Sequence, residues 1–339
     1  MTIYNVKNPS QVGGTAQFYI RTYRGANVID ESLMVGILGF GGEIGTMTST
    51  TVAVDSSSST AAGDISKYIF SFRTDIFLPQ NIYIKIQLPR DTFEVSKFPS
   101  CSSFPINGKL IAGTFTCSYN KELQSIEVRG IGQSIPANSD VGVIISMKNP
   151  RYSFITDTFE MYVMKEGTTL AFTRKLAIKG VPVTAGPITQ ISCYPLDSLY
   201  VTSKGKKMWF ALSFKLTNPL NAGSVISIKL PSSMSFGGLA QVEGVEQDFY
   251  VRSGLQDISD TNPLSIAKFG TLELRISNFM PVAQPDLITI VMYLVTPLSS
   301  GLSTPIQIGS YTDSTMTKEI DKDVSQARIN VNEIGKKLL

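Results

Sequence analysis

The 339-residue sequence contains no histidine. Without it, the chain cannot build a Ser-His-Asp or Cys-His nucleophile system, nor a His-ligated zinc site. It also lacks the side chain most often used for acid–base chemistry near neutral pH. The sequence carries no phosphate-binding loop and no marked pair of carboxylates. We therefore expect no enzyme activity, no catalytic residues, no metal site and no cofactor.

Charge is also scarce. Asp, Glu, Lys and Arg make up 17% of the chain, and 30 basic residues nearly cancel 27 acidic ones. Phosphate binding needs clustered Lys and Arg, so nucleic acid is not an expected partner. No apolar run approaches the roughly 18 residues that span a bilayer, so no membrane span is expected. A near-neutral surface would let copies of the chain pack without strong repulsion.

The chain has only three cysteines. Cys101 and Cys117 flank a stretch of turn-forming residues, which predicts a disulfide between two strands if the chain is secreted. Such a loop would contribute about 3 kcal/mol of stability, and two reduced thiols are the alternative. Cys193 is left as either a buried thiol or an intermolecular link. No Cys-x-x-Cys pair exists, which argues against a thiolate metal site.

A long internal repeat is the strongest pattern present, with a period of about 145 residues. Its first sign is a Lys-Asn-Pro triplet followed at the same distance by Phe, once ending at Pro9 and once at Pro150. Further matches keep the same order: Phe70-Ser71-Phe72 with Leu212-Ser213-Phe214, Leu88-Pro89 with Leu230-Pro231, and Ile126 to Arg129 with Leu272 to Arg275. The chain therefore contains tandem copies of one module.

Each copy reads as β-structure. Runs such as Ile82 to Leu88 and Val225 to Leu230 alternate apolar and polar residues, and Pro, Asn, Gly and Ser separate them. We count about seven to nine strands in each copy, which suits two packed sheets. The predicted fold is all-β, with tandem β-sandwich domains.

The repeat sets the expected domain boundaries. Complete copies cover 44–172 and 186–317, whereas 1–31 matches the terminal strands of a copy. Residues 318–339 read as a linker and the first strand of a following copy. Glu319, Asp321 and Asp323 within it could hold calcium, but a solvated charged linker is favoured. The chain is either a window from a longer array or a subunit whose surplus strands pair with a neighbour.

The Lys-Asn-Pro motif with its following Phe, and the stretch Asn218 to Ser224 leading into an alternating run and Leu-Pro, carry a resemblance. They resemble the tandem β-sandwich repeats of very large secreted or surface-coat proteins of ciliates and other protists. The resemblance implies an extracellular, immunoglobulin-like fold in long arrays that contributes to a glycocalyx or fibre. The first copy departs from the pattern, with Asp75 where the second has Asn218.

We interpret the chain as a structural protein of an extracellular filament or surface coat, joined end to end with itself by linkers or strand exchange. An adhesin that recognises a glycan or cell surface through its loops is the alternative. Exposed aromatic residues beside Asn or Asp would favour that alternative. The residues expected at the inter-subunit joint are Ile3, Tyr4, Val6, Phe18, Ile20, Tyr23, Ile329 and Val331.

Overall fold

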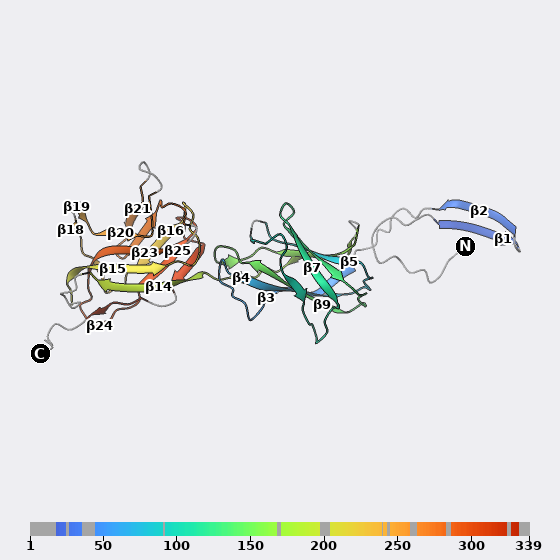
Figure 1. The fold of residues 1–339 in the computed structure, drawn as a ribbon, viewed down its shortest axis with the longest axis horizontal. Helices are drawn as coiled ribbons and strands as arrows, with labels where there is room; N and C mark the ends of the chain where they lie inside the picture. Colours follow the sequence, from blue (N-terminus) through green and yellow to red (C-terminus); the bar gives the residue numbers. More distant parts are fainter. Residues whose placement is uncertain are drawn as a thin grey trace. The chain divides into compact units, whose positions relative to one another are not determined.

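A computed structural model gives the fold (Figure 1). It describes residues 18–24, 27–35, 45–90, 92–167, 171–196, 204–238, 240–242, 245–257, 263–282, 286–323 and 327–331. Over these ranges every regular element is a strand. The same ranges hold no helix of the length and apolarity that a membrane crossing requires.

The chain divides into two compact units. Unit 1 comprises 1–59, 65–148 and 155–181. Unit 2 comprises 60–64, 149–154 and 182–339, so it includes two short segments that the sequence places among the strands of the first copy.

The first sandwich is built from nine strands. One sheet has the order β6-β9-β4-β3 and the other β12-β11-β5-β8-β7, with parallel pairing of β3 and β12 where the two meet. The strands are β3 (Gly45–Val54), β4 (Ile65–Thr74), β5 (Ile82–Gln87), β6 (Cys101–Ser103), β7 (Gly113–Asn120), β8 (Ser125–Ile131), β9 (Asp140–Lys148), β11 (Phe159–Lys165) and β12 (Ala171–Ile178).

Alternation along the strands places the core between the two sheets. In β4, Tyr68, Phe70 and Phe72 are buried at every second position, because successive side chains of a strand point to opposite faces. The ring of Phe70 packs edge-on against Phe159 of the other sheet, with ring centroids 5.8 Å apart. The period-two pattern of the sequence therefore becomes a single core filled from both sheets.

The second sandwich repeats this strand order. One sheet runs β20-β23-β15-β14 and the other β26-β25-β16-β22-β21, again with a parallel pair, β14 with β26. The strands are β14 (Gly186–Pro195), β15 (Lys207–Lys215), β16 (Val225–Lys229), β20 (Phe249–Ser253), β21 (Ser265–Phe269), β22 (Glu273–Ser277), β23 (Leu287–Val295), β25 (Gln307–Tyr311) and β26 (Glu319–Asp323). The prediction of tandem immunoglobulin-like β-sandwich domains is confirmed.

Shorter strands accompany these. β17 (Ser235–Phe236) also pairs with β23, and β18 (Ala240–Val242) forms a hairpin with β19 (Val245–Gln247). The remaining short strands are β10 (Phe154–Ile155), β13 (Pro182–Val183), β24 (Gly301–Leu302) and β27 (Asn330–Val331).

The closing strand of each sandwich corrects the expected boundaries. β12 continues to Ile178, and β26 is an integral strand where a solvated linker was expected. Both strands pair with the first strand of their own sandwich, which lies more than one hundred residues earlier in the sequence. The sequence did not predict β26 as a strand, because the segment is mostly polar and Ile320 is its one apolar residue.

The predicted joint residues near the N-terminus are described only in part. β1 (Phe18–Arg24) pairs antiparallel with β2 (Asn27–Val35), with Phe18 opposite Val35 and Tyr23 opposite Val28. Ile20 lies in β1 as well, whereas Ile3, Tyr4 and Val6 lie outside the described residues. The inter-subunit role of all six stays a prediction.

At the other end, the segment expected to begin a following copy lies against the second sandwich. Ile329 is buried in its core at 3% exposure, and its backbone N–H donates to Ser303 Oγ at 2.9 Å. Val331 belongs to β27, which pairs with β24. Ile329 thus serves the fold of its own unit, and a further role of both residues in a joint stays a prediction.

Candidate functional site: a buried polar joint around Asn218 and Asp321

The candidate site lies where the second unit incorporates residues 60–64. The backbone of this segment bonds to Thr184, just before β14. Ala62 N–H donates to the Thr184 carbonyl at 2.7 Å, and Thr184 N–H donates to the Thr60 carbonyl at 2.9 Å. Ala62 itself is fully buried. Backbone hydrogen bonding therefore makes the 60–64 segment a part of this unit rather than a free loop.

Asn149, from the second Lys-Asn-Pro motif, holds the same segment. Its side chain is 1% exposed, and Nδ2 donates to the Ala61 carbonyl at 2.7 Å. Its backbone N–H donates to the Asp64 carbonyl, also at 2.7 Å. A buried amide must find partners, and here the partners are backbone carbonyls of residues 60–64. In the sequence this motif is a sign of the repeat, and the structure adds this binding role.

Asn218 contacts the segment from the second sandwich. Its side chain is 3% exposed, and Nδ2 donates both to the Ala62 carbonyl at 3.0 Å and to Asp321 Oδ1 at 2.8 Å. The backbone N–H of Asn218 donates to Asp321 Oδ2 at 3.1 Å. One amide group therefore connects the 60–64 segment to the closing strand β26.

Asp321 is the charged centre of this arrangement. It is fully buried, and burial raises its pKa to about 6, although hydrogen bonds from Asn218 and Ser310 act in the opposite direction. Ser310 Oγ in turn accepts the Asp321 backbone N–H at 3.0 Å. The expectation of a solvated Asp321 is wrong, because its strand lies inside the sandwich. In the described ranges no three potential ligands gather to hold a metal.

Two glycines make room for the Asn218 side chain. A Cβ atom on Gly186, at the start of β14, would collide with Asn218 Nδ2 and Asp321 Oδ1. A Cβ atom on Gly63 would collide with Asn218 Oδ1, and Gly63 also has a φ of 74°, which favours glycine. The amide and carboxylate are therefore packed closely on both sides.

The 149–154 segment adds an outer contact within the same unit. Ser153 N–H donates to the carbonyl of Glu319 in β26 at 2.7 Å. Lys318 Nζ lies 4.7 Å from the ring centroid of Tyr152, a cation–π distance. Both segments taken from the first copy are thus attached to the region of β26.

The first sandwich has a simpler arrangement at the equivalent place. Ile76 stands where the second copy has Asn218, and Asp75 is the equivalent of Thr217. Asp75 Oδ2 accepts from Thr46 N at 3.0 Å and from Thr46 Oγ1 at 2.9 Å. Thr173 stands where the second copy has Asp321, and its hydroxyl donates to the Gly45 carbonyl at 2.6 Å. The expected alignment of Asp75 with Asn218 is therefore wrong by one residue, and the apolar Ile76 takes the place of the buried amide.

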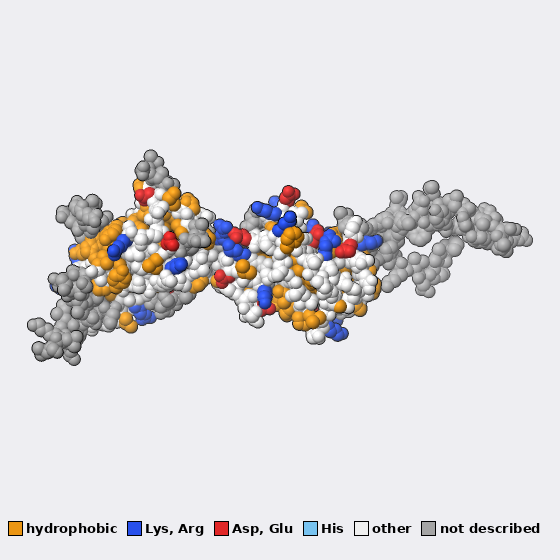
Figure 2. Space-filling view, in the orientation of Figure 1, with side chains coloured by type: hydrophobic (Ala, Val, Ile, Leu, Met, Phe, Trp, Pro, Cys, Tyr) orange, Lys and Arg blue, Asp and Glu red, His pale blue; other side chains and the backbone are white. Residues whose placement is uncertain are grey.

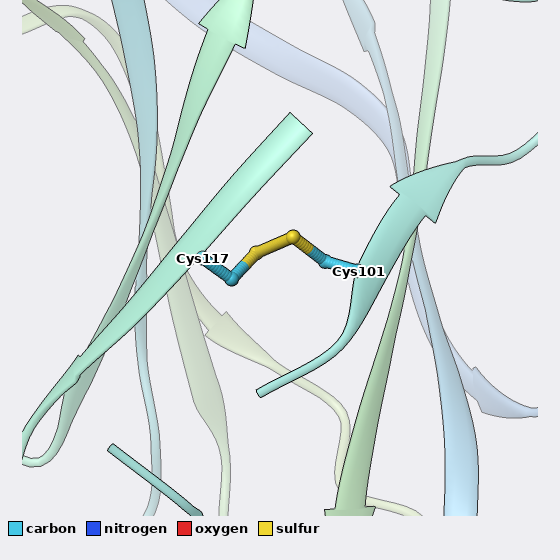
Figure 3. The surroundings of a disulfide bond; sticks show 2 residues. All are labelled: Cys101 and Cys117. Carbon is cyan, nitrogen blue, oxygen red and sulfur yellow. A yellow bond between two sulfur atoms is a disulfide. The ribbon is translucent and has the colours of Figure 1, made fainter. Parts of the chain in front are cut away.

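The predicted disulfide partners lie on facing sheets. Cys101 in β6 and Cys117 in β7 are joined, with their Cα atoms 6.0 Å apart (Figure 3). The link connects the two sheets of the first sandwich, because β6 pairs with β9 and β7 with β8. Cys193 packs on the core of the second sandwich, and burial raises its pKa to about 12. Of the two alternatives for Cys193, the structure favours a buried thiol.

An aromatic group occupies the outer face of β15, β20 and β23. The Trp209 ring lies 5.0 Å from Tyr293 and 6.0 Å from Tyr250 between centroids, and all three residues are partly exposed. On the face drawn in Figure 2, the blue and red charged side chains are scattered among hydrophobic and other atoms. The sequence did not predict that these three rings lie together, because they belong to three separate strands.

Comparison with known proteins yields structural similarity only. No protein-family model matches the sequence, and no curated protein matches it. The fold is similar to the BspA C-terminal domain from Streptococcus agalactiae, at 8% identity and a TM-score of 0.29, covering 84% of this chain and 98% of that one. It is also similar to a type II cohesin dyad from the ScaA scaffoldin of Acetivibrio cellulolyticus, at 10% identity and a TM-score of 0.27, covering 85% and 99%.

Proposed function

We propose that this protein is a structural component of an extracellular filament or surface coat, in which β-sandwich modules are joined end to end. The observation that carries the proposal is the joint around Asn218 and Asp321. There, residues 60–64 of one copy become part of the compact unit formed by the next. Buried hydrogen bonds to the backbone hold this segment within the second unit.

Two further features support this function. The Cys101–Cys117 disulfide is typical of proteins that fold in an oxidising compartment, which favours an extracellular location. The low charge would allow copies to pack side by side. The resemblance to the tandem coat-protein repeats of ciliates and other protists points to the same assignment.

Self-association would use residues at the chain ends. The hairpin β1–β2 pairs with no other strand among the described residues, and a two-stranded hairpin is marginal alone. Its unpaired edges offer backbone groups to another chain. We therefore assign Phe18, Ile20 and Tyr23 to the contact with a second copy.

Electron microscopy of the purified chain tests the assembly. We expect end-to-end fibres from the full chain and monomers from a chain lacking residues 1–31. A matched deletion of 332–339 controls for general effects of truncation. Identical fibres from the chain without residues 1–31 would refute the role of the hairpin, and absence of fibres from the full chain would refute self-assembly.

The aromatic group of Trp209, Tyr250 and Tyr293 supports a second candidate, an adhesin that binds a glycan. Partly exposed rings provide the apolar faces on which sugar rings stack. Glycan-array binding by a monomer that is lost in Trp209→Ala, but kept in Phe98→Ala, would favour this function over the fibre.

A further inference from the structure

The second sandwich carries an acid–base pair at the place where the first carries its disulfide. In the first sandwich, Ser146 N–H in β9 donates to the carbonyl of Ser100, the residue just before Cys101. In the second, Tyr293 N–H in β23 donates to the carbonyl of Asp248, the residue just before β20. Asp248 is therefore the equivalent of Ser100, the residue that directly precedes Cys101 in the first sandwich.

The other partner matches residue for residue. Cys117 in β7 lies opposite Val128 of β8, and Lys268 in β21 lies opposite Leu274 of β22. Val128 and Leu274 are themselves equivalent, because each precedes the Arg of the repeated motif at Arg129 and Arg275. Lys268 therefore takes the position of the second cysteine, and the pair connects the two sheets as the disulfide does.

The carboxylate of this pair is buried, whereas the Lys268 side chain is 35% exposed and passes over two aromatic rings. Asp248 is 4% exposed, and its Oδ2 atom contacts Lys268 Nζ and accepts no hydrogen bond from any other group in the described part of the chain. Lys268 Nζ lies 5.2 Å from the ring centroid of Phe236 and 5.7 Å from that of Phe249. A carboxylate buried here without further donors is costly, and formation of a neutral amide would remove that cost.

Carboxylates in other ion pairs of the described residues are more exposed, although Glu273 beside Arg275 is only 15% exposed. In the Arg129–Glu127 and Lys148–Glu94 pairs, the carboxylate side chains are 32% and 46% exposed, against 5% for Asp248. Water can solvate those carboxylates, and Glu127 faces an Arg, which is a poor nucleophile because it stays protonated. Lysine, by contrast, becomes a nucleophile once it loses its proton in an apolar setting.

We propose that Lys268 and Asp248 form an intramolecular isopeptide bond, a covalent link between the sheets of the second sandwich. The Lys268 ammonium gives a proton to the Asp248 carboxylate, and the neutral Nζ attacks Cγ of the carboxylic acid. The C–N bond forms, one C–O bond breaks, and the oxygen leaves with two protons as water. The condensation involves no change of oxidation state, so it needs no oxidant or cofactor.

Intact-mass spectrometry of the folded full chain tests this link. After denaturation and reduction of the disulfide, we expect a mass lower than the sequence mass by one water molecule. Lys268→Arg keeps the positive charge but cannot form the amide, so its mass should equal the calculated value. Protease digestion of the original chain should give one branched peptide containing Asp248 and Lys268.

The control variant separates this reaction from other dehydrations. A succinimide elsewhere in the chain would survive in Lys268→Arg, and that result would refute the proposal. The full calculated mass in the original chain would also refute it and leave a non-covalent ion pair. Circular dichroism of Lys268→Arg shows whether the variant is folded. If Lys268→Arg does not fold, Asp248→Ala replaces it as the variant that cannot form the amide. The branched peptide from the original chain tests the link independently of either variant.

Discussion

The side-chain amide of Asn218 donates to the carboxylate of Asp321 at 2.8 Å, although the two residues lie 103 positions apart. The same Nδ2 atom donates to the Ala62 carbonyl, so it joins the closing strand of the second sandwich to a segment from the first copy. This relationship makes the stability of the second unit depend on a buried polar group. It is therefore the natural place to test the joint.

Asn218→Ala should destabilise the second unit. The change removes two donated hydrogen bonds and leaves the Ala62 carbonyl and Asp321 with fewer donors in a buried site. We expect a loss of about 2 to 4 kcal/mol in the free energy of unfolding. Denaturant titration followed by Trp209 fluorescence measures this unit, since the chain has one tryptophan.

Asn221→Ala is the matched control for that variant. Asn221 is exposed and lies in the turn directly after Leu220, so its loss should change the free energy of unfolding by less than about 0.5 kcal/mol. Equal midpoints for Asn218→Ala and Asn221→Ala would contradict the role of the buried amide.

The second unit should lose stability as the pH rises from about 4 to about 6. Burial raises the pKa of Asp321 above its ordinary value of 3.8, so the folded state holds a proton that the unfolded state has released over this range. The contribution of Asp321 to the free energy of unfolding is fully present below the pKa that Asp321 has in the unfolded chain. It is lost as the pH rises through the pKa of Asp321 in the folded chain. The change amounts to at most about 3 kcal/mol.

Asp321→Asn should remove this pH dependence, as measured by urea titration at several pH values. Asp313→Asn is the control, because hydrogen bonds from Thr315 and Thr312 lower the pKa of Asp313 and give it the opposite sign. The decline between pH 4 and 6 should persist in Asp313→Asn. Persistence of the same decline in Asp321→Asn would show that another group causes it.

Gly186→Ala should cost about 2 kcal/mol or more, because the added methyl group collides with both Asn218 and Asp321. Gly223→Ala places its methyl group in open space and should leave stability nearly unchanged. Trp209 fluorescence in denaturant compares the two variants directly. If Gly186→Ala unfolds at the same midpoint as Gly223→Ala, the packing around the buried pair is looser than described.

Replacing both Cys101 and Cys117 by Ser should lower the stability of the first sandwich by about 3 kcal/mol. Calorimetry should show a lower unfolding temperature for the first sandwich. Trp209 lies in the second sandwich, so its fluorescence should not report this change. Cys193→Ser provides the control, since the Cys193 thiol is in no disulfide and packs on the other sandwich. Thiol titration of the native chain should find Cys193 slow to react, because burial raises its pKa.

The sequence predicted the repeat and the strand pattern because both depend on local alternation. The run ending at Leu88 and the run ending at Leu230 each announce a buried strand by their own residues. The disulfide partners could be named because three cysteines leave few pairings. The contacts between Asn218 and Asp321 could not be predicted from the sequence. β26 has too little apolar alternation to be recognised as a strand, and Asp321 was therefore interpreted as solvated.

Sequence alone thus determined an all-β chain of repeated modules with little charge and no histidine chemistry. Tertiary structure decided which polar residues are buried together. Parallel pairing of β14 with β26 brings Asp321 beside Gly186, and only that long-range pairing places Asn218 against both. Periodicity reports which face of a strand is buried, whereas partner choice for a buried polar side chain depends on strands that meet only after the chain has folded.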